Sequence, residues 1–210
     1  MVVEGHGEQD AALNLITRLW QDLGLRHTSW VKPIRGQALN TRAGVLKACE
    51  LLRSKADCTH ALLLRDEDDG CPRDAGPQTA QWVRESSLPF PAAVVLAHRE
   101  FETWFLPCVH LMAGRTLTGP EGVERPGLEQ GARFEGSDFE SIRGVKEWLS
   151  KHYAGGRSYK PTLDQLALTR MIDLNMLRAA NVPSFGTLER ALRFLAEAKV
   201  PEVYPPARST

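Results

Sequence analysis

The sequence has few of the features that mark secreted, membrane-spanning or zinc-binding proteins. Its four cysteines, Cys49, Cys58, Cys71 and Cys108, form no C-x-x-C pair and show no spacing suited to zinc. No apolar run approaches the roughly 18 residues that cross a bilayer, and no secretory segment precedes the cysteines. We therefore expect reduced thiols, a cytoplasmic location and no membrane partner.

The chain also has no excess of charge of either sign. Its 26 Lys and Arg residues balance 26 Asp and Glu residues, so any attraction for nucleic acid must be local. Apolar residues make up 42% of the 210 residues, which excludes a disordered chain and allows one core domain with a small appendage. No internal repeat or low-complexity tract is present.

Strand-like and helix-like patterns alternate through residue 112. Buried strands are predicted at 1–3, 60–66 and 91–98, and helical spacing of apolar residues follows each of them and also covers 41–52. Strands that are apolar on both faces are typical of a parallel sheet covered by helices. We predict an α/β fold with a Rossmann-like core at 1–112, whose central, mostly parallel sheet is flanked by helices.

The remainder of the chain is predicted to form a loop and a helical region. Residues 113–137 are rich in Gly and Pro and lack periodicity, so we expect an irregular connection there. Helices are expected at about 138–152, 162–180 and 185–198, in a region 138–210 that packs on the core.

Carboxylates follow the predicted strands. Glu4 ends the first strand, and Asp66 and Asp68 end the second. Parallel strands end at one edge of a sheet, so these side chains should converge, and Glu8 follows across a Gly-flanked turn. An all-oxygen cluster suits Mg²⁺ or Mn²⁺ better than zinc. Two such ions would support in-line displacement at phosphorus.

The alternatives are simpler. An acidic turn such as DEDDG is more often a solvated loop or a helix cap than a metal site. The third strand leads into HREFETW, and Glu100 and Glu102 cannot both face the site if they lie on one helix. His6 is expected to face solvent, and His98 to be hydrogen-bonded in the core.

Two basic segments are candidates for contacting a phosphate backbone. Residues 26–55 carry seven basic residues against Glu50, and residues 141–170 carry six against two acids. A solvated basic helix face explains the second segment equally well. The proposed nucleic-acid contacts are Arg35, Arg42, Lys47, Arg143, Lys146 and Arg157.

Four motifs carry a resemblance to a known domain. VVEGHGE and RDEDDG resemble the hhhEGxxE and DxD motifs of the TOPRIM domain, which topoisomerases, bacterial primases and OLD-family nucleases share. Together with HREFETWFL and YKPTLDQLALTRMID, they are similar to a bacterial TOPRIM-like family of unknown function. The first strand is short for a TOPRIM domain, so either its start lies upstream or the edge of the sheet is frayed.

The resemblance implies roles for six residues. Glu4 matches a glutamate that acts as general acid or base or as a metal ligand, and Glu8, Asp66, Asp68 and Glu102 match further metal ligands. Lys160 matches a late lysine near the scissile phosphate, where an ammonium would stabilise developing charge.

Three functions are compatible with these patterns. The first is a Mg²⁺- or Mn²⁺-dependent nuclease that cleaves DNA or RNA, as an effector in phage defence. The second is a noncatalytic TOPRIM-like module that binds nucleic acid or an ATPase, and the third is a nucleotidyl-transfer or small-nucleotide phosphoryl enzyme. No G-x-x-x-x-G-K-[ST] motif is present, so an ABC- or AAA-type ATPase partner would be a separate chain. A homo-oligomer is a further candidate assembly.

Overall fold

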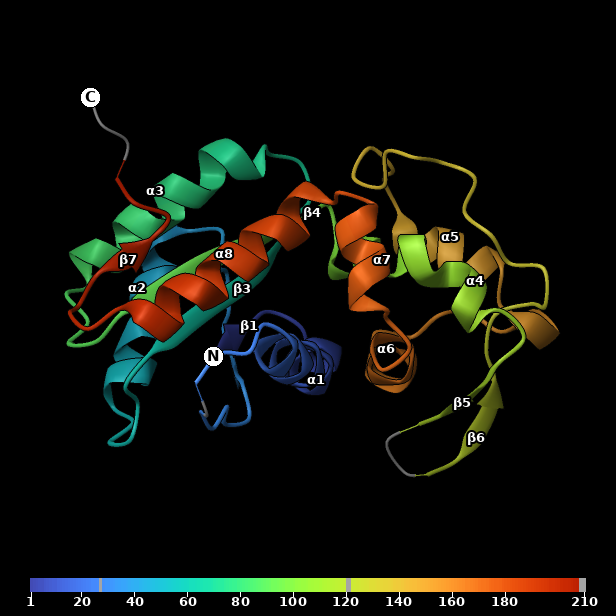
Figure 1. Cartoon of the computed structure of the whole chain (residues 1–210), viewed down its shortest axis with the longest axis horizontal. Coiled ribbons are helices and arrows are strands. Elements are labelled where there is room, and N and C mark those ends of the chain that lie inside the picture. The colour runs from blue at the N-terminus through green and yellow to red at the C-terminus, as the bar shows by residue number, and fades with distance from the viewer. Residues whose placement is uncertain (27, 120–121, 208–210) are drawn as a thin grey trace.

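The computed structural model of this chain describes residues 1–26, 28–119 and 122–207. A five-stranded sheet with the order β2-β1-β3-β4-β7 forms its centre (Figure 1). Every paired neighbour in this sheet is parallel. The strands are β1 (Val2–Val3), β2 (Ile34–Arg35), β3 (Ala61–Glu67), β4 (Ala92–His98) and β7 (Val203–Tyr204). The predicted α/β class, with a mostly parallel central sheet flanked by helices, is confirmed.

The two long strands are buried on both faces because successive side chains point to opposite sides of the sheet. In β3, Leu62 and Leu64 pack into one hydrophobic cluster, and Leu63 packs into the other. The pairing of β3 with β4 is in register along seven positions, from Ala61 opposite Ala92 to Glu67 opposite His98. Both strands therefore deliver their last residues to the same edge of the sheet.

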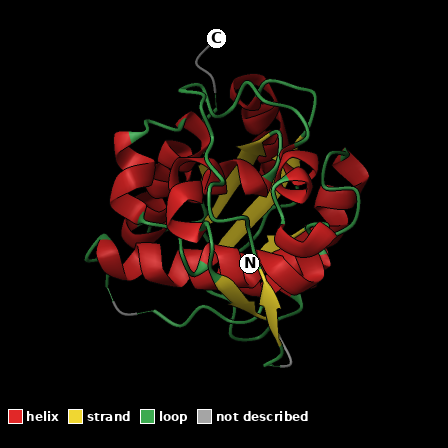
Figure 2. Cartoon of the chain, turned by 90° about the vertical axis from the view of Figure 1, so that its right-hand side faces the viewer, coloured by secondary structure: helices red, strands yellow, loops and turns green. Residues whose placement is uncertain are grey.

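Helices cover each face of the sheet, as Figures 1 and 2 show. Residues of α1 (His6–Asp22) and α8 (Pro183–Glu197) share one cluster with Leu62 and Leu64. Residues of α2 (Arg42–Arg53) and α3 (Pro72–Glu85) share the other cluster with Leu63. The result is a three-layer arrangement of helix, sheet and helix.

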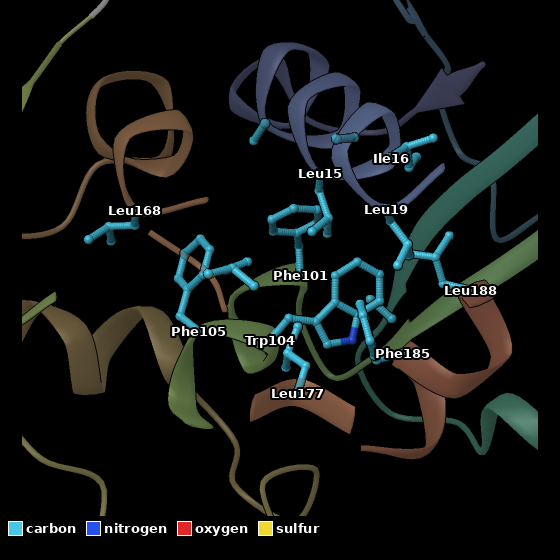
Figure 3. Close-up of a cluster of buried hydrophobic side chains, with 14 of the residues drawn as sticks. Leu15, Ile16, Leu19, Phe101, Trp104, Phe105, Leu168, Leu177, Phe185 and Leu188 are labelled. Carbon is cyan, nitrogen blue, oxygen red and sulfur yellow. The ribbon is translucent and has the colours of Figure 1, made fainter. Parts of the chain in front are cut away.

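A second group of elements follows β4 and lies to the right in Figure 1. Its aromatic centre is the 3₁₀ helix η1, where Phe101, Trp104 and Phe105 face α1, α7 and α8 in Figure 3. The elements are η1 (Phe101–Cys108), α4 (Val109–Met112), β5 (Thr116–Thr118), β6 (Glu124–Pro126), α5 (Val145–Lys151), η2 (Ala154–Gly156), α6 (Pro161–Thr169) and α7 (Leu174–Ala179).

Several predicted elements differ from those observed. The expected irregular stretch 113–137 contains the antiparallel strands β5 and β6, although residues 120–121 lie outside the described residues. The strands β2 and β7 were not predicted, because each consists of two residues in a Pro-containing polar stretch, which is typical of a loop. The single helix expected at 99–112 is instead divided into the 3₁₀ helix η1, which contains Pro107, and the short helix α4. No helix within the described residues is long and apolar enough to cross a membrane.

Candidate functional site

The carboxyl edge of the sheet gathers acidic side chains from three neighbouring strands. Glu4 follows β1, Asp66 is the penultimate residue of β3, and Glu100 lies two residues after β4. Since β1 pairs with β3 and β3 pairs with β4, these residues follow adjacent strand ends. The convergence predicted from strand order is thus present in the backbone topology.

The Lys146 ammonium lies among three of the carboxylates. Its Nζ is 3.6 Å from Asp66 Oδ2, 3.6 Å from Glu100 Oε1 and 3.4 Å from Glu102 Oε2. The backbone N–H of Lys146 also donates to Glu100 Oε2 at 3.1 Å. A residue near the start of α5 therefore supplies the cation that these repelling carboxylates require.

Glu102 is the most deeply buried member of the cluster, with an exposed fraction of 0%. Its Oε1 accepts hydrogen bonds from Tyr159 Oη at 2.7 Å and Gln165 Nε2 at 3.2 Å. Its Oε2 has only the ion-pair contact with Lys146 and no hydrogen bond from the described residues. A carboxylate oxygen buried in this way is costly unless a cation neutralises it.

Gly7 allows α6 to approach α1 and deliver Gln165 to the site. A Cβ at residue 7 would lie 2.5 Å from Gln165 Oε1 and 2.6 Å from the Pro161 carbonyl. The glycine in the EGHGE motif thus has a packing reason, which is distinct from the flexible turn inferred from the sequence.

Glu4 and Glu8 form the second part of the cluster. Glu4 Oε1 accepts from the Leu39 N–H at 3.2 Å, and Glu8 Oε2 accepts from the Glu4 N–H at 3.2 Å. Glu8 lies in the first turn of α1, where a carboxylate is also favoured by the helix dipole. Glu8 acts electrostatically on both Glu4 and Asp66, so it links the two parts of the cluster.

Burial and mutual repulsion raise the pKa values of the carboxyls. The pKa of Asp66 lies well above its usual range, mainly because the carboxyl is buried. The negative charges of Glu102 and Glu8 raise this pKa further, and the positive charge of Lys146 lowers it. Burial also raises the pKa of Glu4, to which Glu8 and Asp68 contribute while Arg65 opposes them. These shifts indicate electrostatic strain that an added positive charge would relieve.

The same contacts keep Lys146 charged. Burial by itself would lower the pKa of the Lys146 ammonium, but Glu102, Asp66 and Glu100 together raise the pKa above its usual value. The net direction is upward because three carboxylates surround a single ammonium.

The other acids of the DEDDG turn are paired or solvated. Glu67 forms an ion pair with the buried Arg65 at 2.6 Å, and Asp69 forms an exposed one with Arg143 at 2.5 Å. The hydrogen bond from Arg143 lowers the pKa of Asp69. Asp68 is exposed, and its carbonyl oxygen accepts from Arg99 Nη1 at 2.7 Å.

Lys160 and Arg157 make their described contacts away from the carboxylate cluster. Lys160 immediately precedes α6, and its side chain is exposed. Among the described residues, the lysine that contacts Asp66, Glu100 and Glu102 is Lys146. Arg157, expected on nucleic acid, pairs with the buried Asp164 at 3.0 Å and lies over the Tyr153 ring. Arg157 therefore contributes to packing, and its contact with nucleic acid stays a prediction.

The remaining basic candidates are spread over the surface. Arg35 lies near the site, where its Nε donates to the Glu4 carbonyl at 3.1 Å and its Nη1 is 2.8 Å from His6 Nε2. Arg42 pairs with Glu85 at 2.7 Å on α2 and α3, and Lys47 is exposed on α2.

Glu100 requires a correction. The sequence argument kept only one of Glu100 and Glu102 at the site because it placed both on a helix. Glu100 instead has extended backbone angles, φ −144° and ψ 153°, immediately before η1. Helical spacing does not apply across this boundary, so both carboxylates reach Lys146.

Tyr159, Gln165 and Arg65 were not identified from the sequence. Their positions depend on how α6 packs on α1 and on how β3 is buried, and no local pattern encodes either. The available signals were two motifs, since YKPTLDQ contains Tyr159 and Gln165, and RDEDDG begins with Arg65.

The donor set fits a hard divalent cation in kind, because every side chain in it is a carboxylate. Within the described residues, however, no three His, Cys, Asp or Glu side chains are already arranged to hold a metal ion. Lys146 stands between the three nearest carboxylates. A metal at Asp66, Glu100 and Glu102 would therefore have to take the position of this ammonium.

A cavity of about 1090 Å³ lies away from this edge. Trp20, Trp30 and Leu195 line it together with Met1 and His60, which precede β1 and β3. None of the site carboxylates is among its described lining residues, so the cavity and the acidic cluster lie at opposite ends of the strands.

The fold and site define an α/β protein with a carboxylate cluster at the carboxyl edge of a parallel sheet. The chain belongs to the family described as domain of unknown function (DUF4276), whose model matches residues 3–193. A search of the curated proteins found no match. A search of the solved structures found none either.

Proposed function

We propose that this protein is a metal-dependent nuclease of TOPRIM type that hydrolyses phosphodiester bonds in DNA or RNA with Mg²⁺ or Mn²⁺. The observation that carries the proposal is the convergence of Asp66, Glu100 and Glu102 on one cation, Lys146, at the carboxyl edge of a parallel sheet. This edge is where open α/β sheets place their ligands. The sequence resemblance to OLD-family nucleases supports the same chemistry.

Two groups of carboxylates are available for metal ions. Asp66, Glu100 and Glu102 would hold one ion, and Glu4 with Glu8 and Asp68 would hold a second. The charges of Glu8 and Asp68 both act on Glu4, and the charge of Glu8 also acts on Asp66. Divalent ions at such a site neutralise phosphate charge and lower the pKa of bound water.

The chain's own residues supply proton transfer and positioning. Burial raises the pKa of Glu4, which brings this carboxyl closer to the range in which a general acid or base works near neutral pH. Arg35 beside Glu4 and Arg143 beside Asp69 lie on exposed surface at the rim, where they would hold the phosphate backbone. An effector role in phage defence with a separate ABC- or AAA-type ATPase belongs to the same proposal.

A noncatalytic binding module is the second candidate. One observation favours it, because Lys146 already pairs with three of the carboxylates without any added ion. In that case the cluster would stabilise the fold, and the basic rim would bind nucleic acid or an ATPase.

Cleavage assays with matched variants separate the two candidates. Plasmid, single-stranded DNA and RNA are incubated with the protein in Mg²⁺ or Mn²⁺, and products are resolved on gels. We expect metal-dependent cleavage that falls at least about 100-fold in Asp66→Asn and Glu4→Gln, since each removes one ligand or proton carrier without changing shape. Glu50→Gln, on the exposed side of α2, is the control and should cleave normally.

Two results would contradict the nuclease. Cleavage that persists in Asp66→Asn would place the activity elsewhere. Nucleic-acid binding without cleavage under either metal would favour the noncatalytic module.

A further inference from the structure

Lys146, near the start of α5, has carboxylates of three residues around its ammonium. Its Nζ contacts Asp66 in β3, Glu100 immediately before η1 and Glu102 within η1. Counted formally, three negative charges face one positive charge, so two negative charges remain. A divalent cation would compensate this group better than an ammonium does.

Glu102 adds an independent reason to expect another ligand at this point. It has no exposed surface, and its Oε2 lacks a hydrogen bond from the described residues. At 3.4 Å from this oxygen, the ammonium is farther away than a well-formed charged hydrogen bond of about 2.8 Å. The ammonium therefore compensates the charge of Glu102 but leaves the hydrogen-bonding capacity of its Oε2 unfilled.

The surroundings of Lys146 allow its side chain to leave. Its exposed fraction is 35%, so solvent already reaches the side chain. The helix α5 that carries it has only seven residues and begins after Gly144, which has a left-handed φ of 72°. Rotation of the flexible four-carbon stem can move the ammonium into water while Val145 and Leu149 keep α5 packed in the core.

We propose that Lys146 is an exchangeable counter-ion, which fills the cation position among Asp66, Glu100 and Glu102 in the metal-free protein and leaves when Mg²⁺ or Mn²⁺ binds. The inference rests on the metal site of the proposed function. It adds that Lys146 lowers the affinity of the site for metal, because the ammonium must be displaced first. The protein can thereby keep these mutually repelling carboxylates together without metal. The metal ion binds only when its concentration is high enough to displace the ammonium.

The first test measures Mn²⁺ binding by titration calorimetry on the wild type, Lys146→Met and Lys151→Met. If the ammonium fills the site about nine-tenths of the time, its removal tightens Mn²⁺ binding on the order of tenfold. Lys151→Met, exposed on the same helix, is the matched control and should bind Mn²⁺ like the wild type. Thermal unfolding with EDTA and with Mn²⁺ shows whether Lys146→Met is folded, and Mn²⁺ should stabilise this variant more than the wild type.

The second test uses the unaltered protein, so it does not depend on the folding of a variant. Brief acetylation followed by mass spectrometry measures how fast each lysine reacts. Exchange predicts that Lys146 is protected in EDTA and reacts several-fold faster with saturating Mn²⁺, because its ammonium has moved into solvent. Lys151 should react equally in both conditions.

The outcomes separate this inference from the proposed function. Equal or weaker Mn²⁺ binding by Lys146→Met, together with unchanged acetylation of Lys146, overturns the exchange and leaves the metal site standing. If Mn²⁺ binds neither the wild type nor either of the two variants, both the exchange and the metal-dependent function are overturned.

Discussion

Individual carboxylates at the sheet edge have different partners, and these differences decide what each can do. Glu67 and Asp69 are paired with arginines, and Glu8 accepts from the Glu4 N–H in the first turn of α1. Asp66 accepts from the Phe101 N–H at 2.8 Å and otherwise faces Lys146. Asp66 and Glu8, which no arginine pairs within the described residues, are therefore better candidates for metal ligands than Glu67 and Asp69.

Asp66 should make stability depend on pH in a defined direction. Its native pKa is raised well above the usual range of an aspartate, mainly by burial and then by the charges of Glu102 and Glu8. A raised native pKa contributes stability that is fully present below the unfolded pKa and is lost as pH rises through the native pKa. We expect the wild type in EDTA to lose stability relative to Asp66→Asn as pH rises from about 4 toward neutral.

Urea unfolding at a series of pH values measures this difference. Saturating Mn²⁺ should remove most of the decline in the wild type, because it compensates the ionised carboxylate. A stability difference that stays constant across the pH series would show that Asp66 titrates normally in the folded protein.

At the scale of elements, one arginine joins three segments around the second half of the chain. Arg157 follows η2, pairs with Asp164 in α6 and donates to the carbonyl of Pro126 at the end of β6. Asp164 in turn accepts from the Lys160 N–H at 2.9 Å, so it caps α6 as well. These contacts hold the β5–β6 hairpin against α6, whose Gln165 reaches Glu102.

Arg157→Gln should therefore destabilise the fold, although the sequence suggested a surface contact with nucleic acid. Removing one partner leaves Asp164, which is 1% exposed, without its cation. We expect the free energy of unfolding to fall by about 2 kcal/mol, less than for a fully buried pair because Arg157 is partly solvated.

Chemical denaturation of Arg157→Gln and Lys160→Gln provides the comparison. Lys160→Gln changes an exposed side chain and should stay within about 0.5 kcal/mol of the wild type. Equal stability of the two variants would show that the ion pair of Arg157 with Asp164 does not stabilise the fold.

At the scale of the whole molecule, the chain returns to its first half at the end. Helix α8 covers one face of the sheet, and β7 then pairs with β4 through Ala92 opposite Val203. Arg84 in α3 donates to the Val203 carbonyl at 3.0 Å and also to the Pro205 carbonyl. The last segment therefore covers the side of β4 that would otherwise be an open strand edge of the sheet.

Removal of residues 200–210 should expose that edge. The Ala92 N–H would lose its 2.9 Å hydrogen bond to the Glu202 carbonyl, and β4 would lose its neighbour. We expect the free energy of unfolding to drop by about 2 kcal/mol or more, with aggregation through the open strand edge.

Thermal unfolding and light scattering of the truncated chain test this expectation. The full-length variant Val200→Ser is the control, since Val200 is 53% exposed and precedes β7. Unchanged unfolding and scattering in the truncated chain would show that β7 is dispensable.

The sequence by itself determined the α/β class, the long strands β3 and β4 and the helix α2. Strands that are buried on both faces need continuous apolar runs, and β3 and β4 have them. Thr41 is a residue type favoured at the start of a helix, and its side chain accepts a 3.1 Å hydrogen bond from the Gly44 N–H in α2. The alternation of strands and helices also predicted that Glu4 and Asp66 follow neighbouring strand ends, and β1 does pair with β3.

The tertiary structure alone decided which cation these carboxylates meet. Lys146, Tyr159 and Gln165 lie between 44 and 63 residues from Glu100 or Glu102 in the sequence, and no local pattern indicates that they contact these carboxylates. The two-residue strands β2 and β7 exist only because longer or neighbouring strands provide their hydrogen bonds. Contacts between distant segments depend on packing after the elements have formed, so periodicity and composition cannot encode them.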